Sequence, residues 1–372
     1  MSTEPALLES LVIADDLTGA CDAAVPFARR GYRTTVRTAN VGGETKSNVL
    51  SFSTDSRDLD AAEICRVMEV AALSTPFRSA RVLFKKIDST LRGQVGTEIS
   101  AALAAFECDA VVVCPAFPAM RRIVEAGYLR VTGASDFRPI EVSAYLRSQG
   151  LAGCVHVHPS GAADAISSGI RSVSLDASCD EDLDRIVATC SSISARILWA
   201  GSAGMASALA RSLPPRNGAT PEMPRRTGPV LFCIGSDHPS TIVQQANLLA
   251  ERRTRPFSCE EATPVSIAST LRCGEHVLLR IPRGQVSAKR ILELTAGAPA
   301  GAVLLSGGDT ASFFCRSAQV RQIDLSYEIV PGIPCGVIGG GEFAGVPVVT
   351  KSGGFGGPDA LIQVADYFAC QN

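Results

Sequence analysis

Short apolar runs alternate with helical segments along most of this chain, and several runs end in loops rich in glycine, aspartate or serine. The first run covers residues 11–14 and precedes a helical segment over 20–30. Further runs over 34–38 and 48–54 follow, with a helix expected over 61–73. Short continuous apolar runs indicate buried parallel strands, which right-handed crossovers must connect. The pattern therefore predicts an α/β fold with mostly parallel sheets flanked by helices.

A proline-rich stretch over residues 213–229 interrupts this alternation and is typical of an interdomain linker. The chain has 372 residues, which is long enough for two domains. We expect one domain over 1–213, a linker over 214–228 and a second domain over 229–372.

Composition excludes several classes of function. Apolar residues make up 46% of the chain and the net charge is −2, so no long basic field is available for nucleic acid. No apolar run approaches the roughly 18 to 20 residues that span a bilayer, and the first ten residues lack the regions of a signal peptide. We therefore expect small-molecule chemistry in the cytoplasm. The 13 cysteines include no CxxC pair, and most, such as Cys114 and Cys233, are expected to be buried hydrophobes.

Two adjacent acids, Asp15 and Asp16, follow the first apolar run. Ligands of open α/β sheets bind outside the carboxyl ends of the strands, so either acid is a candidate metal ligand, hydroxyl acceptor or general base. The alternative for Asp16 is that it only caps the following helix. Arg57 follows a later run in the same way.

The strand expected over 81–86 leads into a loop that contains Lys86, Asp88, Ser89 and Arg92. Lys86 and Arg92 are suited to hold a carboxylate or phosphate, because arginine offers a planar fork and lysine a point charge. A solvated surface loop with Asp88, Ser89 or Thr90 as a cap is the alternative.

Two glycine-rich turns in the second half point to a polyphosphate. One turn covers residues 306–311 and the other 351–357, and each follows an apolar run and precedes a helix. Glycine lets backbone amides approach an anion, and the helix adds its positive end. Neither turn matches a P-loop or a GxGxxG fingerprint. A similar turn over 201–204 is either an anion nest or a close-packed turn, and for His238 a cap or packing role is favoured over general base catalysis.

Six segments together resemble the four-carbon acid sugar kinase family, formerly a domain of unknown function. They are ADDLTGACD (14–22), KKIDSTLRG (85–93), PAFP (115–118), GSAGMA (201–206), SGGDTA (306–311) and KSGGFG (351–356). The resemblance implies an ATP-dependent phosphotransferase that acts on the terminal (4-) hydroxyl of an acid sugar such as D-threonate or D-erythronate, with 3-oxo-tetronate as an alternative. It also implies an amino-terminal substrate domain, a carboxy-terminal nucleotide domain and an active site in the interdomain cleft.

The resemblance further implies a set of site residues. The catalytic residues would be Asp15, Asp16 and Arg92, with one of the two aspartates accepting the hydroxyl proton. The substrate contacts would be Asp15, Arg57, Lys85, Lys86, Asp88, Ser89 and Arg92. The ATP contacts would be Ser236, Ser306, Gly307, Gly308, Asp309, Gly353, Gly354 and Gly356, with Asp309 also a contact for Mg²⁺.

The chain departs from the family pattern in two places. Family members usually have a Gly-Arg pair shortly after PAFP, whereas this chain has Met120, Arg121 and Arg122, and the segment over 136–143 is shortened. Both changes bear on substrate selectivity or on a lid. A non-catalytic acid-sugar sensor is a rival interpretation, and a dinucleotide oxidoreductase is a second rival that the missing Rossmann fingerprint disfavours. The oligomeric state is left open, with a homodimer as one option.

Overall fold

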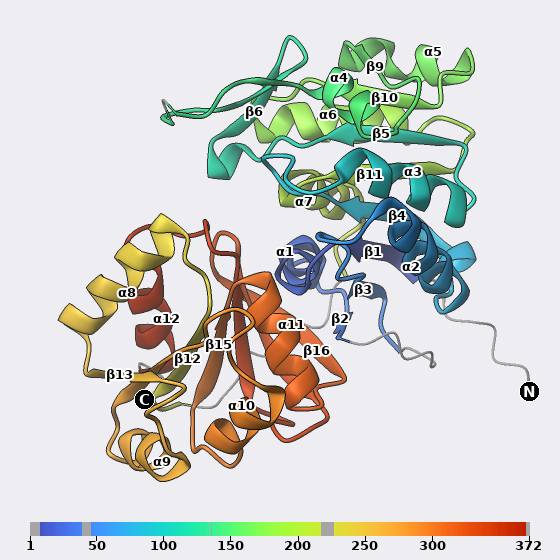
Figure 1. Ribbon diagram of the computed structural model, residues 1–372. Coiled ribbons are helices and arrows are strands. Elements are labelled where there is room, and N and C mark those ends of the chain that lie inside the picture. Colours follow the sequence, from blue (N-terminus) through green and yellow to red (C-terminus); the bar gives the residue numbers. More distant parts are fainter. Residues whose placement is uncertain (1–7, 39–45, 135, 217–226, 370–372) are drawn as a thin grey trace, which may run out of the picture. The chain divides into compact units, whose positions relative to one another are not determined.

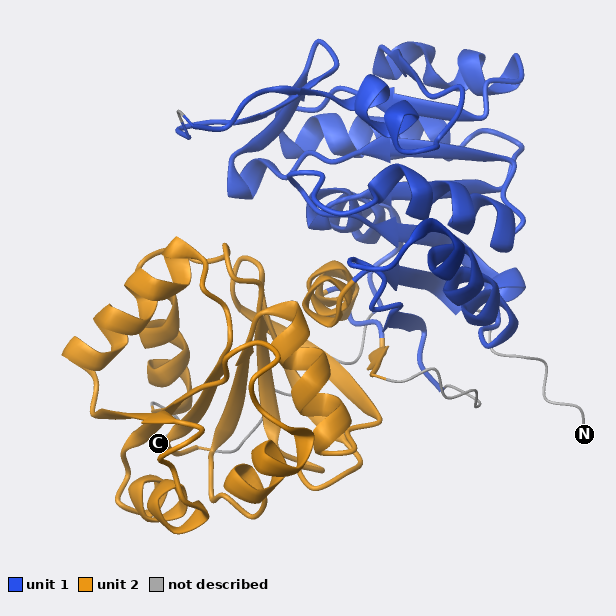
Figure 2. Ribbon diagram, viewed as in Figure 1, with its two compact units in different colours: residues 1–15, 30–32, 42–218 blue, residues 16–29, 33–41, 219–372 orange. Residues whose placement is uncertain are grey.

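The computed structural model describes residues 8–38, 46–134, 136–216 and 227–369 (Figure 1). These residues form two compact units, shown in Figure 2. Unit 1 takes the described residues within 1–15, 30–32 and 42–218, and unit 2 takes those within 16–29, 33–41 and 219–372. Helix α1 (Leu17–Ala28) and strand β2 (Thr34–Arg37) therefore belong to unit 2, whereas the sequence pattern places them in the amino-terminal domain.

Unit 1 is built on a parallel sheet. Its strands are β1 (Leu8–Ala14), β3 (Val49–Ser53), β4 (Ala80–Lys86), β5 (Ala110–Cys114), β9 (Val155–Val157), β10 (Ser172–Leu175) and β11 (Ile197–Gly201). Their order is β3-β1-β4-β11-β5-β10-β9. The register pairs Ala14 with Ser53, and Gly201 with both Lys86 and Cys114. The carboxyl ends of these strands therefore lie level at one edge of the sheet.

The helices of unit 1 follow its strands along the chain. They are α2 (Ala61–Leu73), α3 (Val95–Ala105), α4 (Val142–Ser148), α5 (Ala162–Ser167), α6 (Asp180–Cys190) and α7 (Ala203–Ser212), with 3₁₀ turns at Phe77–Ser79, Pro118–Met120 and Pro159–Gly161. Helix α2 packs beside α3, and α6 beside α7. The crossovers through α3 and α6 run in opposite directions along the sheet, so right-handed connections put these helices on opposite faces.

The segment after β5 forms a separate antiparallel sheet of β6 (Arg122–Glu125), β7 (Tyr128–Val131) and β8 (Ile140–Glu141). Asp176 holds its first turn, because its carboxylate accepts the N–H groups of Ala126 and Gly127 at 3.1 and 2.9 Å. The turn over 201–204 is a close-packed turn, since a Cβ on Gly201 would lie 2.6 Å from the carbonyl oxygen of Cys114.

Unit 2 has a mixed sheet. Its strands are β2, β12 (Val230–Ile234), β13 (Thr254–Ser258), β14 (His276–Arg280), β15 (Ala302–Ser306), β16 (Gln322–Val330), β17 (Ile333–Gly339) and β18 (Pro347–Lys351). Their order is β13-β14-β12-β15-β18-β17-β16-β2, and the run from β13 to β18 is parallel. Strands β17, β16 and β2 pair antiparallel. Ile234 pairs with Arg280 and Ser306, and Ser306 pairs with Lys351. The carboxyl ends of β14, β12, β15 and β18 therefore lie side by side at one edge of the sheet.

The remaining helices of unit 2 are α8 (Pro239–Glu251), α9 (Pro264–Arg272), α10 (Ala288–Thr295), α11 (Gly308–Ser317) and α12 (Ala360–Ala369). Helix α8 packs against α12, and α10 against α11. His238 caps α8, since its Nδ1 accepts the N–H of Ser240 at 3.2 Å, so the interpretation of His238 as a cap is confirmed. Helix α1 packs on β16, and Arg29 forms a 2.7 Å ion pair with Glu328.

The α/β class and the mostly parallel sheets predicted from the sequence are confirmed. Cys114 and Cys233 lie fully buried in strands, as predicted, and burial raises the pKa of Cys114 to about 12. None of the helices in the described part of the chain has the length and apolar character to cross a bilayer.

Candidate active site

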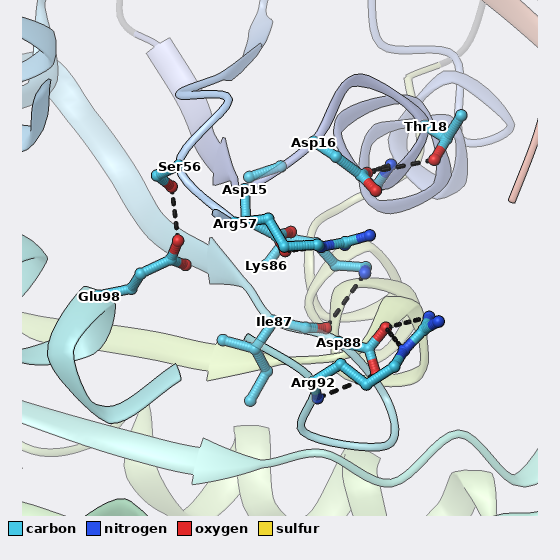
Figure 3. Close-up of polar contacts among 12 residues, drawn as sticks. Asp15, Asp16, Thr18, Ser56, Arg57, Lys86, Ile87, Asp88, Arg92 and Glu98 are labelled. Atoms are coloured by element: carbon cyan, nitrogen blue, oxygen red, sulfur yellow. Dashed lines mark hydrogen bonds and ion pairs between the residues drawn. The ribbon is translucent and has the colours of Figure 1, made fainter. Parts of the chain in front are cut away.

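Asp15 lies at the end of β1 and is only 4% exposed. Arg57, in the loop after β3, donates from Nε to Oδ2 of Asp15 at 2.7 Å. Figure 3 labels both residues among the polar side chains around the end of β1. The other oxygen, Oδ1, is buried and accepts no hydrogen bond from the described residues. Burial raises the pKa of Asp15, but the charges of Arg57, Lys85 and Lys86 outweigh burial and lower it below its usual value. Asp15 is therefore a buried carboxylate anion that presents an unsatisfied acceptor.

Asp88 organises the loop after β4. Its Oδ1 accepts the N–H and the hydroxyl of Thr90 at 2.9 and 2.6 Å, and its Oδ2 accepts two guanidinium bonds from Arg92 at 2.6 and 3.1 Å. Burial raises the pKa of Asp88, but the bonds and charge of Arg92, with Thr90 and Lys86, hold it well below its usual range. Asp88 therefore closes its own loop and orients Arg92 (Figure 3). It does not cap the following helix, because α3 begins after Gln94, which makes no side-chain cap hydrogen bond.

Lys86 is 5% exposed and donates to the carbonyl of Ile87 at 3.1 Å. Its charge lowers the pKa of both Asp15 and Asp88, which places its ammonium near both carboxylates. Ser89 is 7% exposed. Unit 1 thus gathers Asp15, Arg57, Lys86, Asp88, Ser89 and Arg92 at the carboxyl ends of β1, β3 and β4.

Lys85 has its own charged partner on α3. Its ammonium is fully buried and forms a 2.7 Å ion pair with Glu98 of α3. Glu98 also accepts the hydroxyl of Ser56 at 2.5 Å, and the N–H of Ser56 donates to the carbonyl of Asp15 at 3.2 Å. Lys85 therefore holds the loop that carries Arg57. We leave it out of the proposed substrate contacts.

Arg122, which follows Arg121 in the segment after PAFP, is a candidate site residue that the sequence does not predict. Its guanidinium donates to the carbonyl of Met120, and its Nε has no partner among the described residues. Burial lowers the pKa of Arg122, while the charge of Asp88 raises it, so Arg122 lies near the Asp88 loop. Arg121 has a φ of +61°, the left-handed conformation that glycine adopts without cost. Arg121 and Arg122 belong to the segment in which the chain departs from the expected family pattern.

In unit 2 the loops after β12, β15 and β18 meet where the carboxyl ends of these strands lie side by side. A Cβ on Gly353 would lie 2.3 Å from Oγ of Ser236, and a Cβ on Gly307 would lie 3.6 Å from Cβ of Ser236. Ser236 therefore lies between the two glycine-rich turns. Gly307 has a φ of +103°, which requires glycine, and Ser306 carries a buried hydroxyl with no partner among the described residues. The predicted ATP contacts of all three loops lie together in this unit.

Helix α11 begins at Gly308, directly behind this group. Its cap residue, Gly307, has no side chain to satisfy the first amides of the helix, which leaves them for an anion. Asp309 is exposed and forms a 2.9 Å ion pair with Arg283. Within the described ranges, no three side chains of the metal-binding types gather into a metal site.

Asp16 belongs to unit 2 and caps α1, because its Oδ1 accepts the N–H of Gly19 at 2.5 Å and the hydroxyl of Thr18 at 3.2 Å. A Cβ on Gly308 would lie 2.5 Å from Oδ2 of Asp16, so that position requires glycine. Thr18 in turn accepts a hydrogen bond from Ser352 at 3.1 Å. The predicted cap is present, and the same carboxylate lies against the first residue of α11.

Comparison with known proteins adds independent findings. Residues 10–148 match a sugar-binding N-terminal domain model, and residues 281–361 match a nucleotide-binding C-terminal domain model. The chain is 32% identical to a D-threonate kinase of Bordetella bronchiseptica, covering 95% of this chain and 96% of that protein. It is 31% identical to a D-threonate kinase of Cupriavidus necator, covering 94% and 96%. Matches at 23 to 27% identity are named D-erythronate kinase or 3-oxo-tetronate kinase.

A solved structure from Salmonella typhimurium LT2 shares the fold, with a TM-score of 0.76, 19% identity and coverage of 96% of this chain and 99% of that chain. The near-full-length identity above 30% shows the family: this chain belongs to the four-carbon acid sugar kinase family. It is an enzyme of the phosphotransferase class, and ATP is the phosphate donor that its kinase relatives imply. These findings do not favour the alternative of a non-catalytic sensor.

Proposed function

We propose that this chain phosphorylates the terminal (4-) hydroxyl of a four-carbon acid sugar, with D-threonate as the first candidate and D-erythronate as the second. One observation carries the choice of acid. The relatives named D-threonate kinase match at 29 to 32% identity, whereas those named for other acids reach at most 27%. 3-Oxo-tetronate is the alternative substrate, and a homodimer stays a prediction.

The polar groups of unit 1 support an acid-sugar site. A four-carbon acid sugar carries one carboxylate and several hydroxyls, and guanidinium and ammonium groups are suited to hold the carboxylate. We assign that role to Arg57, Lys86 and Arg92, which gather beside Asp15 and Asp88. Oδ1 of Asp15 would accept a substrate hydroxyl, because it has no partner among the described residues.

The two aspartates divide the work in this proposal. Asp15 is committed to Arg57 and its pKa is lowered, so it orients the substrate but is a weak proton acceptor. Asp16 has one oxygen in the helix cap and the other against Gly308, the first residue of α11. We therefore assign the role of general base to Asp16. Phosphoryl transfer requires the hydroxyl and the γ-phosphate to meet in line, and a base that accepts the hydroxyl proton assists the attack.

Mg²⁺ fits the residues present. It is usually bound through one or two carboxylates together with substrate phosphates and several waters. Asp309 supplies a carboxylate at the amino end of α11, and the Asp309–Arg283 ion pair is exposed and easily exchanged. When bound with ATP, the ion would neutralise phosphate charge. The amides of α11 and the glycine-rich turns would hold the phosphate oxygens beside it.

The substrate is tested by measuring ADP release with purified protein over threonate, erythronate and 3-oxo-tetronate, using both enantiomers of each chiral acid. The highest kcat/KM should belong to D-threonate. Absence of ADP release with every acid would refute the kinase function, and a clear preference for 3-oxo-tetronate would move the substrate to the alternative.

The assignment of Asp16 is tested by Asp16→Asn. Asparagine also caps helices well, so α1 should keep its start. We expect kcat to fall by roughly 10² to 10⁴, the usual contribution of a general base, with little change in acid-sugar binding. Asp60→Asn is the matched control, because Asp60 caps α2 in a capping box on the surface. Equal kcat values for the two variants would remove Asp16 from the chemistry.

A further inference from the structure

Lys351, the last residue of β18, has an unusual environment in unit 2. It is 0% exposed, and its ammonium donates to the carbonyls of Ser352, Gly353 and Phe355 at 3.1 to 3.2 Å. A fourth contact, to Oγ1 of Thr241, is 3.2 Å long. Three of its four acceptors are therefore carbonyls of the glycine-rich loop that begins directly after it.

Gln244 of α8 binds the other half of the same loop. Its Nε2 lies 2.9 to 3.1 Å from the carbonyls of Phe355, Gly356 and Gly357, and the side chain is 0% exposed. Together, Lys351 and Gln244 bind all the carbonyls from 352 to 357 except that of Gly354.

This pattern fixes where the loop amides point. In a planar trans peptide the N–H of one residue points opposite to the C=O of the residue before it, and the described chain has no cis peptide bond. The amides of Gly353, Gly354 and Gly356 follow carbonyls held by Lys351, so they are directed away from its ammonium. None of these three amides donates to another residue within the described ranges. Phe355, which follows the one unbound carbonyl, instead turns its amide back to Ser352 at 3.1 Å.

The charge of Lys351 also lacks a counter-ion. Its hydrogen bonds in the described part of the chain all go to neutral oxygens, although burying an unpaired cation is costly. Burial alone lowers its pKa to about 7. A polyphosphate on the outward amides would supply the missing negative charge, so two independent observations indicate an anion at this loop.

We propose that Lys351 is a positioning residue for ATP: with Gln244, it turns the loop carbonyls inward so that the amides of Gly353, Gly354 and Gly356 face the phosphates. This role depends on the proposed nucleotide site, and it adds Lys351 and Gln244 to the residues proposed there. Lys351 acts through the loop, and it does not touch the nucleotide.

Calorimetric titration with ATP tests this role on full-length wild type, Lys351→Met, Lys351→Gln and Gln244→Met. Methionine keeps the volume but has no donor, and we expect ATP affinity to fall about 10- to 100-fold, as for one or two lost charge-assisted hydrogen bonds. Glutamine keeps two donors without the charge, so Lys351→Gln should retain more affinity than Lys351→Met. Gln244→Met should also weaken ATP binding, since it removes one of the two donors to the carbonyl that precedes Gly356.

The kinetic signature is a raised KM for ATP with an unchanged KM for the acid sugar, which a general loss of folding would not produce. Lys85→Met/Glu98→Leu is the control, because it removes a lysine that is equally buried at a strand end of unit 1. That variant should keep the ATP affinity of the wild type. Urea unfolding of each variant shows that the protein used in the titrations is folded.

Each outcome decides the proposal. If Lys351→Met binds ATP as tightly as the wild type does, the proposal is overturned. If Lys351→Gln and Lys351→Met lose the same ATP affinity, the charge of Lys351 and not its orientation of the loop is what matters, and the positioning role is rejected. Wild type that binds no ATP would refute the nucleotide site itself, so failure of the function is distinguished from failure of this role.

Discussion

The buried ion pair of Lys85 and Glu98 leads to a quantitative prediction about unit 1. The side chains are 0% and 4% exposed, and Nζ lies 2.7 Å from Oε2. Lys85→Met leaves the carboxylate buried with the hydroxyl of Ser56 as its remaining described partner. We expect the free energy of unfolding to fall by about 3 to 5 kcal/mol, the usual result of removing one member of a buried pair. That is a large share of the roughly 5 to 15 kcal/mol that stabilises a typical protein.

The double variant Lys85→Met/Glu98→Leu should recover most of this loss, because apolar residues of similar volume often replace a buried pair without cost. Recovery should stop short of the wild type by about 0.5 to 1.5 kcal/mol, since Ser56 then loses Glu98 as its acceptor. Urea unfolding followed by tryptophan fluorescence is the assay. Trp199 is the only tryptophan of the chain and pairs with Phe84 of β4, one residue from Lys85, so its signal reports unit 1.

Two results would refute this reasoning. One is a loss below about 1 kcal/mol in Lys85→Met, which is the range of an exposed pair. The other is a double variant no more stable than the single one. The same proteins also separate the two roles considered for Lys85. A KM for the acid sugar that stays unchanged in the double variant supports the structural role, and a raised KM in a fully stable protein would return Lys85 to the substrate contacts.

Two further predictions concern backbone strain and pH. Arg121→Gly should stabilise the protein by about 0.5 to 1 kcal/mol, because relief of left-handed strain exceeds the entropy cost of glycine; a midpoint in urea no higher than that of Arg121→Ala would contradict this. Burial lowers the pKa of Lys351 from 10.5 to about 7, so the unfolded chain binds more protons between these values. The stability of wild type relative to Lys351→Met should therefore rise by about 1.4 kcal/mol per pH unit through this window in urea unfolding, and a flat difference would disprove it.

Local patterns in the sequence predict the elements that local forces determine. The helix expected over 61–73 is α2, whose start is set by the capping box of Asp60 and Glu63. The antiparallel pair β16 and β17 was not predicted, and neither was the membership of α1 and β2 in unit 2. Both depend on pairing between distant segments, such as Ile323 with Val36, which no local pattern encodes.

The candidate site shows the same limit. The rule that carboxyl ends of parallel strands meet was sufficient to bring Asp15, Arg57 and Lys86 together. It could not separate Lys86 from Lys85, because neighbouring residues of a strand point to opposite faces and the partner of Lys85 lies on α3. Lys351 was missed as a functional residue for a related reason. A lysine at a strand end suggests a ligand, whereas here it binds the backbone of its own loop.

The membership of α1 and β2 in unit 2 has a consequence during synthesis. Both segments leave the ribosome early, but β16, their partner, starts only at Gln322. At about 5 to 20 residues per second, the wait lasts on the order of tens of seconds. During that time α1 has β2 to pack against but lacks β16, and the edge of β2 that pairs with β16 stays open. Unpaired strand edges promote aggregation. The nascent chain therefore passes through a stage in which the first segments of unit 2 have been synthesised but the strand that they pair with has not.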